Sequence, residues 1–264
     1  MEDYAGSLAQ GSVLYSDSAD WEAHAGPVDV KMCRPSFIPN HIKLLQSGSD
    51  TEKLAAARVL TILTSEDAAT LDVGKSRVEI ASAGAPAALI KIMSASDAPA
   101  AEDDTTITLA KEAAAATLCN LCAQDDSRAL VVEAGGIPAL VGLIDHEPSD
   151  ELLKYACGAL GNLARESVEN QEAIAGVGGI PKLIGIARTV GIREDGEEAT
   201  KETEDAEDDT GLELNASIAL RKLAVANAAN YKAMQDVLSE SELRYFLHGE
   251  LPADGLVPEA ERAD

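Results

Sequence analysis

The stretch that decides the fold is residues 131–165, VVEAGGIPALVGLIDHEPSDELLKYACGALGNLAR. Between Glu151 and Ala164 the apolar residues fall at positions 152, 153, 156, 159, 160, 163 and 164, which places them on one stripe of a 3.6-residue helix. Ahead of this helix, Gly135 can take the left-handed conformation that ends a preceding helix, and Pro138 has the fixed φ that opens the next one. The stretch therefore predicts a unit of helix, sharp turn, helix, short loop and helix.

The same unit recurs along the chain. Two or three helices with a period of about 40 to 47 residues are typical of stacked helical repeats, and surface insertions explain longer steps. One unit is too small to bury its own apolar stripe, so neighbouring units must stack into a right-handed superhelix. The turn signature stands at Ile38-Pro39, Ala85-Pro86, Ile137-Pro138 and Ile180-Pro181, with steps of 47, 52 and 43 residues between the prolines.

Two motifs connect these units to a known family. The turn EAGGIPALV at 133–141, its partner GGIPKLI at 178–184 and the helix Ala-Leu-Gly-Asn-Leu-Ala at 159–164 closely resemble the armadillo repeat. The resemblance covers roughly residues 36–238. It implies an all-α fold, a right-handed superhelix (armadillo solenoid) of about four repeats.

The predicted domain organisation follows the repeats. We expect a poorly ordered acidic arm before them, an acidic insertion inside the fourth repeat, and a capping helix with a loose tail after them. The predicted ranges are 1–35 for the arm, 36–238 for the repeats (36–65, 73–123, 126–165, 168–225 with the insertion at 191–210, and a partial repeat at 228–238) and 239–264 for the C-terminal part.

Composition limits the function. The 264-residue chain has 21 Lys and Arg against 46 Asp and Glu, a net charge of −25, which disfavours binding to nucleic acid or to an anionic membrane. Ten of the acids fall within residues 194–209. Four cysteines without a short regular spacing fit a reducing compartment. The sequence contains no apolar run of 18 residues, so we expect no transmembrane helix. We therefore expect a cytoplasmic or nuclear protein.

The resemblance also implies a binding groove. In the armadillo family the third helices line a concave groove, and the Asn of Ala-Leu-x-Asn-Leu-Ala points into it. By resemblance Asn120 and Asn162 occupy those positions, where their amides can hold the backbone of an extended peptide. An exposed or locally capping amide is the alternative. The matching positions in repeats one and four are Ile62 and Lys222, so the predicted amide ladder has two rungs. The remaining groove candidates by helical spacing are Arg58, Glu66, Gln124, Tyr155, Glu166 and Asn215.

Residues with catalytic or metal-binding patterns are not found. Cys119-x-x-Cys122 is half a metal site without a second pair, and the acidic segment around Asp205 lacks the glycine and glutamate positions of a calcium loop. The four histidines have no adjacent nucleophile. We expect no catalytic residue, no cofactor and no metal.

The sequence thus predicts a non-catalytic protein–protein interaction module, or scaffold, for an extended or basic peptide or a partner helix. Two other classes stay open: a co-chaperone that clamps a folded domain, as armadillo nucleotide-exchange factors do, and a structural subunit of a large assembly. An importin-like cargo adaptor fits less well, because Ala116 and Gly158 stand where such adaptors carry tryptophan. The oligomeric state stays open.

Overall fold

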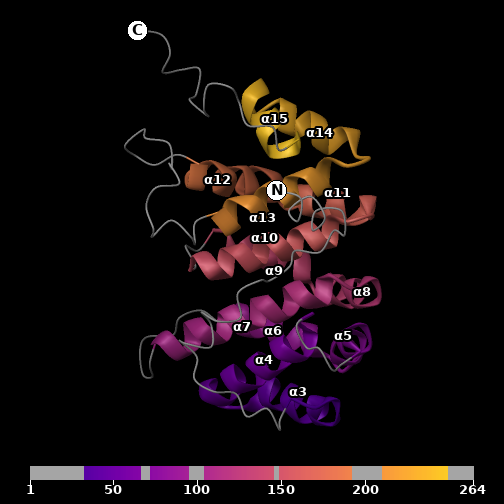
Figure 1. Ribbon diagram of the computed structural model, residues 1–264, viewed down its shortest axis with the longest axis vertical. Helices are drawn as coiled ribbons and strands as arrows, with labels where there is room; N and C mark the ends of the chain where they lie inside the picture. The colour runs from indigo at the N-terminus through magenta and orange to yellow at the C-terminus, as the bar shows by residue number, and fades with distance from the viewer. Residues whose placement is uncertain (1–32, 67–71, 95–103, 146–148, 192–209, 249–264) are drawn as a thin grey trace.

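The computed structural model describes residues 33–66, 72–94, 104–145, 149–191 and 210–248 (Figure 1). The predicted N-terminal arm up to residue 32, the acidic insertion at 192–209 and the tail after residue 248 lie outside the described residues.

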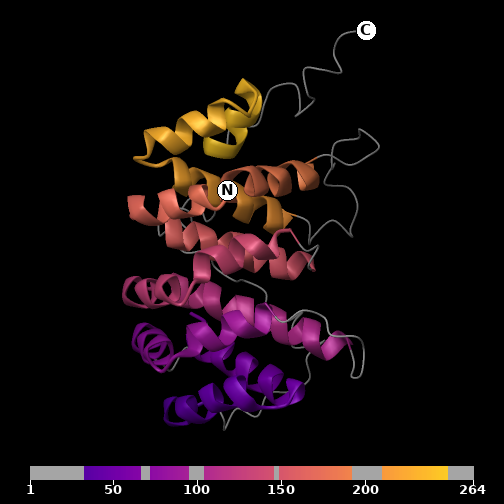
Figure 2. The same cartoon turned by 180° about the vertical axis from the view of Figure 1, so that it is seen from behind.

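The described residues form an elongated stack of helices (Figures 1 and 2). Each complete unit has a short first helix, a second helix and a longer third helix. The first helices are α5 (Val73–Ser82), α8 (Asp125–Glu133), α11 (Val168–Gly176) and α14 (Ala228–Gln235). The second helices are α3 (Ile38–Ser47), α6 (Ala85–Met93), α9 (Gly136–Leu143) and α12 (Gly179–Gly191), and the third are α4 (Asp50–Thr64), α7 (Asp104–Cys122), α10 (Asp150–Ala164) and α13 (Thr210–Ala224). A 3₁₀ turn, η2 (Pro35–Phe37), precedes α3, and α15 (Glu240–His248) follows α14.

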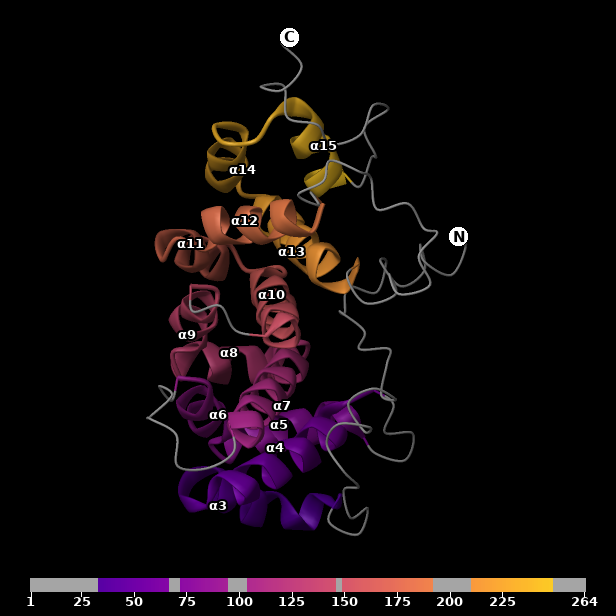
Figure 3. The same ribbon diagram turned by 90° about the vertical axis from the view of Figure 1, so that its left-hand side faces the viewer.

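The third helices pack on one another in a single row. α4 contacts α7, α7 contacts α10 and α10 contacts α13, and Figure 3 shows this row running along the long axis. Two leucines recur at the same places in every third helix, and each buried leucine contributes about 1.5–3 kcal/mol of transfer free energy. All eight are fully buried: Leu60, Leu63, Leu118, Leu121, Leu160, Leu163, Leu220 and Leu223.

The turns between first and second helices need glycine for two different reasons. Gly135 and Gly178 have φ values of 85° and 81°, in the left-handed region where a Cβ is unfavourable. The next glycine has an ordinary φ but lies close to the preceding helix: a Cβ on Gly136 would come within 2.5 Å of Cγ1 of Val131. The Gly-Gly pair therefore brings the second helix tightly against the first.

Side chains from the first helices hydrogen-bond to carbonyls at the ends of the third helices. The last carbonyls of a helix have no partner inside that helix. Nε of Arg77 donates to the carbonyl of Thr64 at 2.8 Å, and Nε2 of Gln171 donates to the carbonyl of Ala164 at 3.1 Å. Nε2 of Gln171 also lies 2.9 Å from the carbonyl of Lys222 in the next third helix. These bonds join consecutive repeats.

The C-terminal helix α15 covers the end of the stack and packs on α13. Phe246 is 1% exposed there. Nε of Arg188 on α12 lies 2.7 Å from Oε1 of Glu242, so an ion pair joins α15 to the last second helix.

We expect a large side chain at Gly161 to destabilise the stack. A Cβ at this position would lie 3.3 Å from Cα of Ala219 on α13, so Gly161→Leu forces α10 and α13 apart at a cost of about 1–3 kcal/mol. In the matched control, a Cβ on Gly185 of α12 would have no atom within 4 Å, so Gly185→Ala stabilises by up to about 1 kcal/mol through helix propensity. Urea unfolding of both variants measures the difference, and equal midpoints would contradict the close packing.

At Ala226, in contrast, we expect a substitution by glycine to stabilise the protein. It has a φ of 56°, in the left-handed region, where a non-glycine residue costs about 1–2 kcal/mol. Ala226→Gly should therefore stabilise the protein by about 0.5–1 kcal/mol after the added chain entropy of glycine. Ala233→Gly, at an exposed position inside α14, should instead destabilise by about 1 kcal/mol. Thermal unfolding compares them, and a loss of stability in both would show that Ala226 is unstrained.

Candidate functional site

The candidate site is the surface of the third helices together with the turns that follow them, here called the third-helix surface. The two predicted asparagines occupy equivalent places on α7 and α10. Nδ2 of Asn120 donates to Oγ1 of Thr64 at 3.2 Å, and Nδ2 of Asn162 donates to the carbonyl of Cys119 at 3.3 Å. Each amide therefore bonds to the preceding third helix, which explains why asparagine is found inside these helices.

The two asparagines differ in exposure. Asn120 is half-buried, whereas Asn162 is 1% exposed. Both amides were expected to point into the concave groove, but the Asn162 side chain is almost completely covered. The row of stacked helices covers this side chain, and its Nδ2 is used between α7 and α10.

Lys222 lies within a group of positive charges that we call the basic cluster, namely Arg128, Arg165, Arg221 and Lys222. Burial, and then repulsion from Arg165, Arg128 and Arg221, lowers the pKa of Lys222 to about 8, while Glu166 acts in the opposite direction. The Lys222 ammonium is thus partly desolvated and surrounded mainly by like charges.

Backbone carbonyls hold two guanidiniums of the basic cluster in place. NH1 of Arg128 donates to the carbonyl of Asn162 at 3.2 Å, and NH2 of Arg165 donates to the carbonyl of Ala123 at 2.8 Å. Both guanidiniums also pair with Asp125, NH2 of Arg165 at 3.3 Å from Oδ1. The negative end of a helix dipole stabilises cations at these C-terminal ends.

Sequence reasoning missed Arg128 and Arg165. One signal for Arg128 was available, because Arg77 and Arg128 each stand seven residues before the turn glycine of their repeat, Gly84 and Gly135. Their function at helix ends becomes visible only when the third helices are in place.

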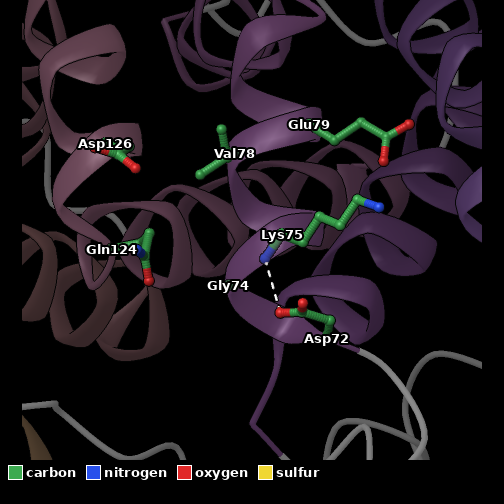
Figure 4. A pocket seen from close by; sticks show the side chains of 7 residues that line it. All are labelled: Asp72, Gly74, Lys75, Val78, Glu79, Gln124 and Asp126. Carbon is green, nitrogen blue, oxygen red and sulfur yellow. Dashed lines mark hydrogen bonds between the residues drawn. The ribbon is translucent and has the colours of Figure 1, made fainter.

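The remaining predicted residues lie in different surroundings. Arg58 and Tyr155 are 8% and 9% exposed, and burial lowers the pKa of the Arg58 guanidinium. Glu166 is exposed, with a φ of 56°, in the turn after α10. Gln124 lines a shallow hollow between first helices α5 and α8 (Figure 4), together with Asp72, Gly74, Lys75, Val78, Glu79 and Asp126. Gln124 thus belongs to the first-helix side of the stack.

Burial disfavours ionisation of the three buried thiols. Burial raises the pKa of Cys119 and of Cys157 to about 12, and that of Cys122 well above its usual value. They are neutral at pH 7 and pack as small apolar side chains. Within the described ranges, no group of three or more His, Cys, Asp or Glu side chains could hold a metal ion.

No helix in the described part of the chain is long and apolar enough to cross a membrane.

Comparison with known sequences connects the central repeat to a family. The family described as Armadillo/beta-catenin-like repeat matches residues 124–165. "Vacuolar protein 8" of Candida albicans is 28% identical over 148 residues, which cover 56% of this chain and 22% of that protein. "Splicing regulator ARVCF" of Homo sapiens is 40% identical over 80 residues, 30% of this chain and 8% of that protein. The chain thus matches less than a quarter of the length of these relatives.

Several solved structures with the same fold are designed proteins. "Designed armadillo repeat protein YIII(Dq)4CqI" has a TM-score of 0.59 and 18% identity, and the match covers 86% of this chain and 87% of that one. A related design, in complex with the peptide (KR)4, has a TM-score of 0.53 and 18% identity over 85% of each chain. The predicted fold class is confirmed: the described residues have the armadillo fold, an all-α right-handed superhelix of about four repeats, and residues 124–165 match the armadillo repeat itself.

Proposed function

We propose that this protein is a non-catalytic interaction module that binds an extended peptide or a partner helix along its third-helix surface. Armadillo-repeat proteins are protein-binding scaffolds. The observation that carries the proposal is the unbroken row formed by α4, α7, α10 and α13, which runs along the long axis of the stack (Figure 3).

The spacing of this row suits an extended ligand. Packed helices lie about 8–10 Å apart, and an extended chain advances about 3.3 Å per residue. About three ligand residues therefore span one repeat, so a segment of about ten residues can contact all four third helices. Main-chain contacts repeated at each step would give affinity, and a few side-chain sites would give specificity.

Within this surface we assign direct contacts to Asn120 and Lys222, which are half-buried. The half-buried Asn120 amide keeps acceptor capacity on Oδ1 while its Nδ2 bonds to Thr64. Three predicted residues are buried, so we assign them no direct contact with the ligand: Asn162, Arg58 and Tyr155. A designed armadillo protein in complex with (KR)4 supports the general mode of binding, since it shares this fold.

The test is selection of peptides of ten to twelve residues from a random display library, followed by affinity measurement on variants. Asn120→Arg introduces a bulky charge on the third-helix surface and should weaken the selected peptides at least tenfold. Glu172→Arg, an exposed position on the first helix α11, makes a charge change on the other side and should leave affinity unchanged. Thermal unfolding of both variants checks that the fold is retained.

Hydrogen exchange on the complexes gives an independent check of the location. Bound peptide should protect backbone amides of α7, α10 and α13. Protection confined to α5, α8 and α11, together with loss of affinity in Glu172→Arg, would overturn the proposal.

A further inference from the structure

The exposed large apolar side chains of this protein gather in one part of the stack. Among the described residues there are four of them, and all belong to α11, α14 or the turns directly next to these helices: Val168 (47% exposed), Val177 (44%), Val225 (63%) and Val237 (53%). Single apolar side chains on a surface are ordinary, but a group on neighbouring helices marks an interaction surface. We call this surface of α11 and α14 the valine face.

The valines stand in two pairs, one at each end of the valine face. Val168 opens α11 and Val225 lies in the turn before α14, and Nε2 of Gln171 on α11 donates to the carbonyl of Val225 at 3.2 Å. Val177 and Val237 follow the ends of α11 and α14. The two helices contact each other and, as first helices of consecutive repeats, run in the same direction, away from the row of third helices (Figure 3).

The middle of the valine face carries one charge of each sign. Glu172 on α11 and Lys232 on α14 occupy equivalent places, because each stands five residues after the N-cap of its helix, Ser167 or Asn227. Both side chains are exposed, and neither forms an ion pair with another described residue. The exposed residues around this pair include three alanines: Ala173, Ala229 and Ala233.

This pattern is complementary to itself. A two-fold axis passing between α11 and α14 places α11 of one copy against α14 of a second copy, in the opposite direction. Val168 then lies against Val237 of the second copy, and Val225 lies against Val177. In the middle, Glu172 lies opposite Lys232 of the second copy, and the same pair forms a second time on the other side of the axis.

One pair of like charges limits this association. In the same arrangement Glu169 approaches Asp236 of the second copy, and both residues are exposed. The valine face is also small: α11 has nine residues, so it is about 13 Å long, and neighbouring helices lie about 10 Å apart. Interfaces below about 1,200 Å² of total buried area are typical of weak, transient complexes.

We propose that the valine face is a self-association surface, through which two copies of this chain form a weak two-fold dimer. The net charge of −25 repels the copies at long range, but screening over about 8 Å at physiological salt leaves local contacts to decide. The inference goes beyond the proposed function and does not depend on it. The dimer leaves both third-helix surfaces open, so it presents two copies of that surface to one partner.

The test is sedimentation equilibrium of the full chain from 1 to 300 µM, in buffer with 0.15 M salt at pH 7. We expect a monomer–dimer equilibrium with a Kd on the order of 10–100 µM. Val225→Asp and Val237→Asp, one at each end of the valine face, should each weaken it at least tenfold. Ala129→Asp is the matched control, since it adds the same charge at an exposed position on the first helix α8 and should leave the Kd unchanged. Thermal unfolding checks that all variants keep the fold.

Charge exchange tests the antiparallel arrangement itself. Glu172→Lys and Lys232→Glu each place like charges opposite one another twice, so each should weaken the dimer about fivefold or more. The double variant restores both pairs with the signs exchanged and has the net charge of the wild type, so its Kd should return to within about twofold. Asp236→Asn removes the like-charge approach to Glu169 and should tighten the dimer about two- to threefold.

Three outcomes would overturn the inference: a monomer up to 300 µM, equal losses for Val225→Asp and Ala129→Asp, or no recovery in the double variant. Peptide affinity at 1 µM protein, where the chain is monomeric, tests the proposed function separately. Val225→Asp should leave that affinity unchanged, because the valine face and the third-helix surface lie on different sides of the stack.

Discussion

The structure depends on the burial of each third helix against the next. A single repeat cannot cover the leucine stripe of its own third helix, so Leu160 and Leu163 on α10 become fully buried only between α7 and α13. Gly161 stands on the side where α13 comes closest and lets the two backbones approach. The second helices and the tight glycine turns then complete each unit around this row.

Apolar packing alone leaves the ends of the third helices with unpaired carbonyls, and the way these are satisfied shapes the surface. Arg77, Arg165 and Gln171 donate to them across repeat boundaries, and Arg128 donates to one within its own repeat. Where the donor is a neutral amide, as in Gln171, the bond links repeats and adds no charge. Where it is arginine, the same bond also fixes a cation on the surface, and in repeats three and four these cations collect around Lys222. A structural requirement of the stack thus places positive charges at these helix ends.

The electrostatic potential of this protein differs in sign between long range and the immediate surroundings of Lys222. Over long distances the chain is strongly acidic, which favours solubility and gives basic molecules a weak, salt-sensitive attraction. Within a few ångströms of Lys222 the sign is reversed, and partial desolvation strengthens the local interaction. Net charge alone therefore does not describe the local field at this part of the surface.

The sequence by itself determined the repeat unit, because that unit depends on local chemistry. Gly135 and Pro138 set the turn through backbone sterics, and the leucine spacing of 152–164 sets the buried face of α10. The all-α fold followed from the repetition of this unit and from its resemblance to the armadillo repeat.

Only the tertiary structure decided which of the candidate residues meet. Asn162 was expected in an open groove and is instead covered, bonding to Cys119, which lies 43 positions earlier in the chain. Gln124 lies on the first-helix side, and Lys222 meets Arg128 and Arg165 from the neighbouring repeat. These contacts depend on the offset and rotation between stacked repeats. That geometry arises from packing across whole helices, so a pattern local to one repeat does not encode it.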